Sequence, residues 1–293
     1  MNQERIRYIS PFVICLIAIF LLTFFCEIAF TAEETKDEKA EAATSAKEYE
    51  PASDEVVEQT GLELLTGKDT PLKKDMVIDF FGDSITWQGG YLNIMNTALG
   101  ASKYTKELNI KLIKRGINGG KSTNLRDGCE DLYGCTQDPF AKVLETDKPA
   151  VAVIYIGIND VWHGKNGTTP EDFEKCINEL LTQAKNAGVV PVVATLSIIG
   201  EIPDGSNEFD EKLDQYAEIT RKVADENDAT LVDLRKVFID YLKEHKELVK
   251  KEDGSEVYER KGLLTYDGVH MTELGNELLA DEISIGIFEA LNK

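Results

Sequence analysis

A histidine near the C-terminal end of the chain follows an aspartate at a spacing suited to acid–base chemistry. Asp267 precedes His270 by three residues, just before the last predicted helix. On one turn, such an acid can hydrogen-bond one imidazole nitrogen and leave the other free to take a proton from a serine hydroxyl. The chain has only two other histidines: His245 lies in a polar segment typical of a surface, and His163 lies in a loop able to line a cleft. Because histidine is the natural base near neutral pH, His270 is the leading candidate.

A serine stands where the first apolar segment of the predicted domain ends. Residues 76–81 form this short apolar run, and Gly82, Asp83 and Ser84 follow it. A hydroxyl there would lie at the sheet edge, close to the N-terminus of the next helix, whose N–H groups and dipole can stabilise an oxyanion. Serine and aspartate are also common helix N-caps, so the turn alone fits a cap at least as well as a nucleophile.

Two further loops contain groups that can donate hydrogen bonds to a developing negative charge. Residues 115–122 are rich in glycine and end in Gly-Lys-Ser, but Arg115 occupies the position where a phosphate-binding P-loop requires glycine. Such a loop can instead bring a substrate carbonyl close to backbone N–H groups, or it can be a simple turn. Asn159 has an uncharged amide suited to an oxyanion, and an Asx turn is the alternative.

The elements that must position these groups alternate along the chain. Continuous apolar runs, typical of parallel strands buried on both faces, occupy residues 76–81, 110–113, 150–156, 189–196 and 230–234. Between them lie amphipathic segments; Thr169 and Pro170 mark one helix start, Gly188 its end, and residues 207–228 and 272–292 are similar. This alternation predicts an α/β fold, doubly wound, with function at the carboxyl ends of the strands.

Together, the four loops resemble the SGNH hydrolase family, also called GDSL esterases and lipases. That family carries Gly-Asp-Ser, a glycine-containing loop, Gly-x-Asn-Asp and Asp-x-x-His in this order. Here the four blocks are Gly82-Asp83-Ser84, Asn118-Gly119-Gly120, Gly157-Ile158-Asn159-Asp160 and Asp267-Gly268-Val269-His270. The resemblance spans residues 76–292 and implies the flavodoxin-like fold of the family, a mostly parallel five-stranded sheet with helices on both faces.

The resemblance also implies roles for five residues. Ser84 would be the nucleophile, His270 its base, and Asp267 the acid that orients the base. The oxyanion hole would combine the backbone N–H groups of Ser84 and Gly119 with the side chain of Asn159. No metal and no organic cofactor is implied.

One block departs from the family pattern. Gly119 is followed by Gly-Lys-Ser, where the family usually has Gly-Asp-Thr or a similar sequence. Gly116 and Gly120 therefore compete with Gly119 for the oxyanion role. Asp83 and Asp160 are expected to be structural.

The activity that the resemblance implies is ester hydrolysis through an acyl-enzyme. Residues 157–164, with Trp162 after the Asn-Asp pair, look like the same stretch in SGNH acetylesterases that act on decorated sugars. The expected substrate is a small ester or an acetylated saccharide, and the expected reaction is carbohydrate O-deacetylation. A short-chain carboxylesterase, a lysophospholipase and an acyltransferase with the same residues are alternatives. A non-catalytic carbohydrate-binding module would be expected to lack Ser84, Asp267 or His270, and all three are present.

Charge and hydropathy limit the partners and divide the chain. Of 293 residues, 32 are Lys or Arg and 53 are Asp or Glu, a net charge of −21 that argues against binding nucleic acid. Residues 1–32 contain an uncharged run of about 16 residues and predict a signal peptide or signal anchor, hence export to the periplasm or the exterior. Membrane contact is expected only through this segment if it stays uncleaved. Residues 33–74 are expected to be an acidic, disordered linker, and residues 75–293 the hydrolase domain.

Three of the five cysteines lie in the predicted domain. Cys129 and Cys135 are close enough in sequence for a small disulfide loop after export. Cys176 falls on the apolar face of a predicted helix, which predicts a buried free thiol. The chain has neither CxxC nor a Cys/His cluster with metal spacing, which argues against a structural zinc site.

Overall fold

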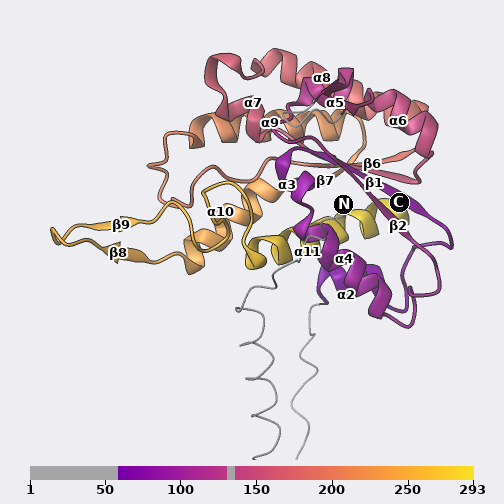
Figure 1. Ribbon diagram of the computed structural model, residues 1–293, viewed down its shortest axis with the longest axis horizontal. Helices are drawn as coiled ribbons and strands as arrows, with labels where there is room; N and C mark the ends of the chain where they lie inside the picture. Colours follow the sequence, from indigo (N-terminus) through magenta and orange to yellow (C-terminus); the bar gives the residue numbers. More distant parts are fainter. Residues whose placement is uncertain (1–58, 131–135) are drawn as a thin grey trace, which may run out of the picture. The chain divides into compact units, whose positions relative to one another are not determined.

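The computed structural model describes residues 59–130 and 136–293. Its centre is a parallel sheet of five strands, in the spatial order β2-β1-β5-β6-β7 (Figure 1). The strands are β1 (Val77–Gly82), β2 (Lys111–Gly116), β5 (Val151–Tyr155), β6 (Val190–Ala194) and β7 (Thr230–Val232). Each falls on a predicted apolar run, with shifts of a few residues at the ends. Chain order 2-1-3-4-5 is the doubly wound arrangement, in which the winding direction reverses between β1 and β5.

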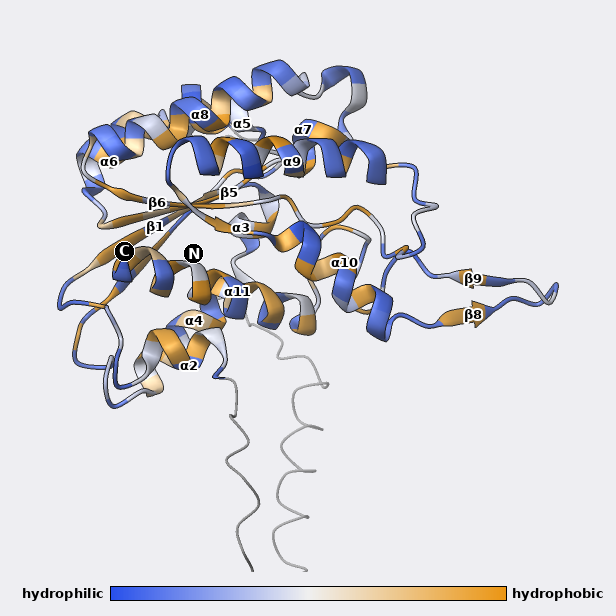
Figure 2. Cartoon of the chain, turned by 180° about the vertical axis from the view of Figure 1, so that it is seen from behind, coloured by the Kyte–Doolittle hydropathy of each residue, from blue (hydrophilic) through white to orange (hydrophobic). Residues whose placement is uncertain are grey.

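Helices cover both faces of this sheet, as predicted. One face carries α5 (Ser122–Asp127), α6 (Phe140–Asp147), α8 (Pro170–Asn186) and α9 (Asp210–Glu226), and the other α2 (Gly61–Thr66), α4 (Gly90–Ala101) and α11 (Glu273–Asn292) (Figure 1). Further helical elements are α3 (Ser84–Gln88), α7 (Ile158–Trp162), the 3-10 turn η1 (Gly164–Asn166) and α10 (Leu234–His245). Apolar residues concentrate in the strands and on the inner helix faces (Figure 2).

Local sequence accounts for these elements. All five residues of β5 are buried, as expected for a central parallel strand that reads as one apolar run. Helix α8 begins where predicted, because the Thr169 hydroxyl accepts a hydrogen bond from the N–H of Asp172 and Pro170 is the first helical residue. Cys176 is buried on this helix as a free thiol, which confirms that prediction.

The folded body begins before residue 75, so the predicted boundary between linker and domain was wrong. Helix α2 packs on α11, where the Asp281 carboxylate accepts a hydrogen bond of 3.0 Å from the N–H of Leu62. Leu65 and Leu72 are 1% and 6% exposed. Regularly placed leucines follow the acidic stretch and supply the apolar surface that the stretch itself lacks. Residues 59–74 therefore belong to the domain.

Among the described residues, two antiparallel pairs of strands lie outside the main sheet. One pairs β3 (Cys129–Glu130) with β4 (Thr136–Gln137), and the other pairs β8 (Leu248–Lys250) with β9 (Glu256–Tyr258). The β8–β9 hairpin projects from the body (Figure 1), and Leu248 at its base is 49% exposed. A two-stranded hairpin gains little stability by itself, so its base must be held by other contacts.

Some predictions fall on residues that the structure does not describe. The export segment 1–32, most of the expected linker and Cys135 of the expected disulfide lie outside the described residues. Across residues 59–130 and 136–293, no helix combines the length and apolarity needed to cross a bilayer.

Candidate active site

The candidate residues gather where the winding direction of the sheet reverses. Ser84 follows β1 directly, and Asn159 lies in α7, just after the neighbouring strand β5. In an open parallel sheet, loops after two strands that wind in opposite directions diverge and leave a crevice at the carboxyl edge. The fold therefore places the Ser84 and Asn159 loops at the position where such sheets bind ligands.

An uninterrupted chain of hydrogen bonds joins Ser84, His270 and Asp267. The Oγ of Ser84 lies 2.8 Å from the Nε2 of His270, and the Nδ1 of His270 lies 2.7 Å from the Oδ2 of Asp267. Because the carboxylate accepts a hydrogen bond from the Nδ1–H group, Nε2 is left to accept one from the serine hydroxyl. Ser84 is a buried residue, 7% exposed. The residues are 186 positions apart in sequence, and only the fold brings them together.

Asp267 is ionised and is held by hydrogen bonds from its own loop. Partial burial acts to raise the pKa of this carboxyl, but hydrogen bonds from the ring and N–H of His270 and from the N–H of Val269 lower the pKa below its ordinary value. The two N–H groups lie 2.8 and 3.0 Å from Oδ1. Asp267 therefore remains an acceptor throughout the neutral pH range.

The sharp turn before Ser84 depends on the residues on its N-terminal side. A Cβ on Gly82 would lie 2.2 Å from the Thr86 hydroxyl and 2.6 Å from the Tyr155 carbonyl, so only glycine fits there. Asp83 caps α3 by accepting a hydrogen bond of 2.9 Å from the N–H of Ile85, in agreement with its predicted structural role. Burial raises the pKa of Asp83 to about 7.

Gly119 and Gly120 of the second loop differ in backbone conformation and in hydrogen bonding. Gly119 has φ +73°, a left-handed conformation suited to glycine. The N–H of Gly120 is occupied, because it bonds the Ile117 carbonyl at 2.9 Å. The Asn159 amide donates one hydrogen bond, of 3.0 Å, to the Gly120 carbonyl, and its second N–H remains for another acceptor.

Asp160 joins the second and third loops. Its carboxylate accepts hydrogen bonds from the N–H and the hydroxyl of Ser122, the latter at 2.7 Å. Burial raises the pKa of Asp160, although these hydrogen bonds oppose the shift. The contacts agree with the predicted structural role.

The chain contains a second Asp–His pair with the spacing of Asp267 and His270. Asp160 precedes His163 by three residues, yet Asp160 bonds Ser122 and His163 is exposed. Spacing alone therefore did not single out His270.

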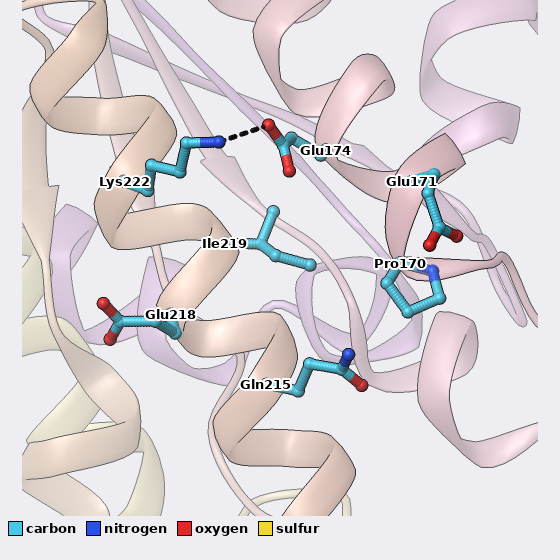
Figure 3. Close-up of a pocket in the computed structure, with 7 residues that line it drawn as sticks. All are labelled: Pro170, Glu171, Glu174, Gln215, Glu218, Ile219 and Lys222. Carbon is cyan, nitrogen blue, oxygen red and sulfur yellow. Dashed lines mark hydrogen bonds and ion pairs between the residues drawn. The ribbon is translucent and has the colours of Figure 1, made fainter.

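Other parts of the described chain offer no comparable chemistry. Within the described ranges, no group of three or more His, Cys, Asp or Glu side chains is arranged to hold a metal ion. A groove of about 460 Å³ lies between α8 and α9 (Figure 3). Its lining includes the ion pair between Lys222 and Glu174, 2.7 Å apart, but no serine, cysteine or histidine. This groove therefore lacks the hydroxyl–imidazole pair that Ser84 and His270 form.

Sequence analysis missed two groups around the site. Gln88 donates a hydrogen bond of 2.9 Å to the hydroxyl of Tyr266, whose ring stacks on His270 with centroids 5.8 Å apart. Glu201, fully buried after β6, bonds the segment before Tyr266. A lone acid inside the apolar stretch 189–203 was the available signal for Glu201, whereas nothing in the sequence linked Gln88 to Tyr266.

Comparison with known proteins identifies the family of the chain. Residues 80–278 match the model of the GDSL-like lipase/acylhydrolase family. An acetylxylan esterase of Geobacillus stearothermophilus is 25% identical over 184 residues, 59% of this chain and 70% of that protein. A crystal structure of an acetyl xylan esterase is 33% identical, with a TM-score of 0.57, and covers 71% of this chain and 98% of its own.

A solved variant of the Geobacillus stearothermophilus acetyl xylan esterase has a TM-score of 0.60 at 21% identity, covering 74% of this chain and 97% of its own. At that identity the likeness supports the fold alone. The family match extends over two thirds of the sequence and includes the loops of Ser84, Gly119, Asn159 and His270 up to residue 278. The chain belongs to the GDSL-like lipase/acylhydrolase family and is a carboxylic ester hydrolase of the SGNH type.

Proposed function

We propose that the protein is a carbohydrate O-deacetylase in which Ser84 is the nucleophile, His270 its base and Asp267 the group that orients the base. The observation that carries this proposal is the pair of hydrogen bonds, 2.8 and 2.7 Å, linking the three side chains. Nucleophilic catalysis by serine requires this contact between hydroxyl and base, with the base oriented by a third group.

The proposed reaction has two acyl-transfer steps. The Oγ of Ser84 attacks the ester carbonyl as His270 takes the hydroxyl proton, and the collapsing intermediate releases the alcohol, which receives that proton. The carbonyl carbon is then bonded to Oγ as an acyl-enzyme. Water attacks this ester, again with His270 as base, and releases the acid and the free serine. The N–H groups of Ser84 and Gly119 and the amide of Asn159 would stabilise both oxyanions.

Two observations support an acetylated saccharide as substrate. Two of the similar proteins are named acetyl xylan esterases. In addition, Tyr266 beside His270 and Trp162 at the end of α7 are 51% and 44% exposed. Exposed aromatic rings beside a polar site suit the apolar face of a sugar. Export through residues 1–32, which we also propose, would bring the enzyme to polysaccharides outside the cytoplasm.

Acetate release distinguishes the candidate functions. The full chain should release acetate from acetylated xylooligosaccharides, and should hydrolyse 4-nitrophenyl acetate much faster than the octanoate, with Ser84→Ala as the blank. A preference for octanoate or for lysophospholipid would contradict deacetylation and favour a lipase-like activity. Transfer of acetate to added xylooligosaccharide at a rate above hydrolysis would instead identify an acyltransferase.

Asp267→Asn should lower kcat on 4-nitrophenyl acetate by roughly 10³- to 10⁴-fold. An amide at this position loses the charge that stabilises the imidazolium and can donate to Nδ1, which favours the wrong tautomer of His270. The measurement is steady-state kinetics at neutral pH, with Asp204→Asn as the matched control, because Asp204 is an exposed carboxylate on a separate loop. Equal activity in both variants would show that Asp267 does not act on the base.

Tyr266→Ala should raise KM for acetylated xylooligosaccharide about 5- to 20-fold and change the kinetics of 4-nitrophenyl acetate much less, because losing a stacking contact costs roughly 1–2 kcal/mol. Tyr104→Ala is the matched control: Tyr104 is 42% exposed but precedes β2, at the opposite edge of the sheet. A uniform loss on both substrates would mean that Tyr266 supports His270 rather than binding sugar.

A further inference from the structure

A buried carboxylate from another part of the chain holds the loop that carries Asp267 and His270. Glu201 lies between β6 and α9 and is 0% exposed. Five donors converge on its two oxygens at 2.5–3.0 Å: the N–H groups of Leu263, Leu264 and Thr265, the Thr265 hydroxyl and the Lys246 ammonium. The segment of three consecutive residues ends directly before Tyr266, so Glu201 fixes the entry to the catalytic loop.

No neutral side chain can replace this carboxylate. Each oxygen faces at least two donors, so an amide would turn its own N–H groups toward N–H groups or toward an ammonium. Burial acts to raise the pKa of Glu201, but the bonds from Lys246 and from the backbone lower the pKa below its ordinary value. Glu201 is therefore ionised at neutral pH, and its charge is balanced by the contacts it organises.

The backbone beside Glu201 bonds the same loop at two further points. The N–H of Gly200 donates to the carbonyl of Gly268 at 2.7 Å, and the N–H of Glu201 donates to the carbonyl of Arg260 at 3.0 Å. Gly268 lies between Asp267 and His270. The segment after β6 thus contacts the loop both before its catalytic residues, at Arg260, and between them, at Gly268.

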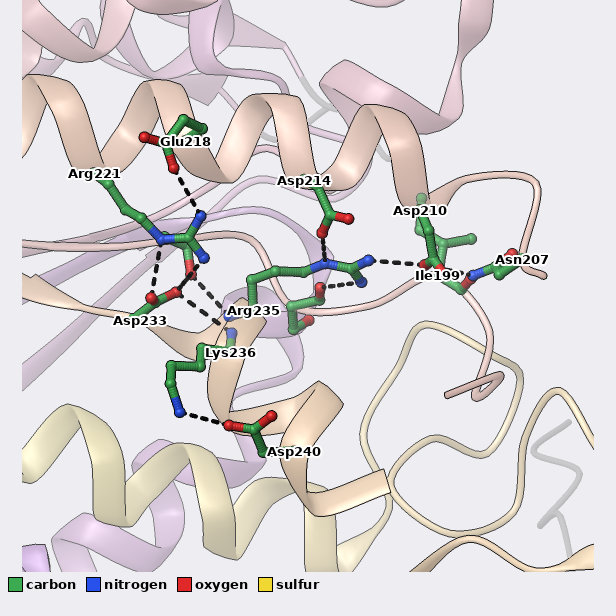
Figure 4. A network of polar contacts seen from close by, with 12 residues as sticks. Ile199, Asn207, Asp210, Asp214, Glu218, Arg221, Asp233, Arg235, Lys236 and Asp240 are labelled. Carbon is green, nitrogen blue, oxygen red and sulfur yellow. Dashed lines mark hydrogen bonds and ion pairs between the residues drawn. The ribbon is translucent and has the colours of Figure 1, made fainter. Parts of the chain in front are cut away.

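This supporting segment is itself anchored by a polar network (Figure 4). Asn207 donates to the Ile199 carbonyl at 2.7 Å, directly before Gly200. Arg235, 4% exposed, bonds Asp210 at 2.8 Å and reaches the Ser197 carbonyl at 3.4 Å. Because the segment around Glu201 is itself fixed by these hydrogen bonds, it can hold the loop of Asp267 and His270 in one position.

Lys246 connects the same carboxylate to the projecting hairpin. Its ammonium, with a side chain 8% exposed, also donates to the Lys261 carbonyl at 3.0 Å. Lys246 stands just before β8 and Lys261 just after β9, so the two ends of the hairpin meet at Glu201. The hairpin base and the catalytic loop therefore share one charged centre.

We propose that Glu201 is a positioning residue for ester hydrolysis: it sets the loop that carries Asp267 and His270 at the distance from Ser84 that proton transfer needs, and Lys246 ties this loop to the β8–β9 hairpin. The inference rests on the roles proposed above for Ser84 and His270. It predicts that loosening Glu201 affects turnover more than substrate binding, because a small misplacement of a base lowers kcat without removing contacts to the substrate.

The test compares Glu201→Gln with wild type in the full chain, on 4-nitrophenyl acetate, at a temperature well below Tm. We expect kcat to fall about 10- to 100-fold with KM within about 3-fold. Lys246→Met, which leaves four of the five donors on the carboxylate, should lower kcat about 3- to 10-fold. Lys243→Met is its matched control, since Lys243 is exposed on α10, and should leave kcat unchanged.

Two measurements separate positioning from stability. Leu65→Ala creates a core defect in α2, far along the chain from the loop, and should lower Tm without lowering kcat. The imidazole proton shared by Asp267 and His270 should give a low-field ¹H NMR signal that shifts or broadens in Glu201→Gln but not in Leu65→Ala. This signal does not depend on turnover.

An unchanged low-field signal with kcat within 2-fold of wild type in Glu201→Gln would overturn the inference. If that variant does not fold, the Lys246→Met result decides, with an unchanged kcat counting against the inference. Failure of the proposed function has a different signature: Ser84→Ala would then hydrolyse esters as fast as wild type, whatever the Glu201 variants do.

Discussion

Ser84→Ala should lower kcat for ester hydrolysis by roughly 10⁵- to 10⁶-fold, the largest loss expected for any single substitution in this chain. Without the hydroxyl no acyl-enzyme forms, and any remaining rate must come from water attacking a carbonyl held in the oxyanion hole. Substrate binding should change little, because alanine is smaller than serine. The measurements are the burst of 4-nitrophenol and steady-state acetate release, both of which should vanish into the background.

The control for Ser84→Ala is another serine outside the site. Ser255 lies in the exposed turn between β8 and β9, where its hydroxyl bonds Asp253 at 2.6 Å. Ser255→Ala should keep full activity, and both variants should retain the circular dichroism spectrum of the wild type. If Ser84→Ala kept more than about 1% of kcat, covalent catalysis by this residue would be wrong.

His270→Ala should reduce kcat about 10⁴- to 10⁶-fold, because no side chain then remains to take the proton from Ser84. Without the imidazole, the residual rate should rise with hydroxide concentration, because hydroxide must then act as the base. The measurement is the pH–rate profile of both proteins on 4-nitrophenyl acetate.

The other two histidines provide controls for this prediction. His245→Ala removes an exposed imidazole from α10, and His163→Ala removes the exposed one that follows α7. His245→Ala should leave the pH–rate profile unchanged, since its ring contacts Tyr241 and not the site. If His163→Ala lost activity while His270→Ala kept it, the base would be His163 and not His270.

Parts of this molecule could be predicted because their cause is local in sequence. Strands such as β5 follow from continuous apolar runs, and α8 from the cap at Thr169. The order of strands and helices then determines a doubly wound sheet, because parallel neighbours need crossover helices. Four short blocks in order were enough to indicate the family, since three of them follow strands of the sheet and the fourth precedes the last helix.

Other parts were decided by contacts between segments far apart in sequence. The domain begins earlier than predicted because α2 packs on α11 and Leu65 and Leu72 are buried. No local sequence pattern predicts this long-range contact. Likewise the spacing of Asp267 and His270 occurs a second time at Asp160 and His163, and only the partners of each carboxylate distinguish the pairs.

The sequence by itself therefore determined the elements, their order and the residue types available for chemistry, because these depend on local propensity and periodicity. Only the tertiary structure decided which of those residues meet. It brought Ser84 to within 2.8 Å of His270 across 186 positions, and it placed Glu201 against the segment that leads into the loop of Asp267 and His270. Hydrogen bonds and buried charges depend on which residues lie close together in space. Crossover connections bring together residues that are far apart in the sequence, so sequence position does not give these distances.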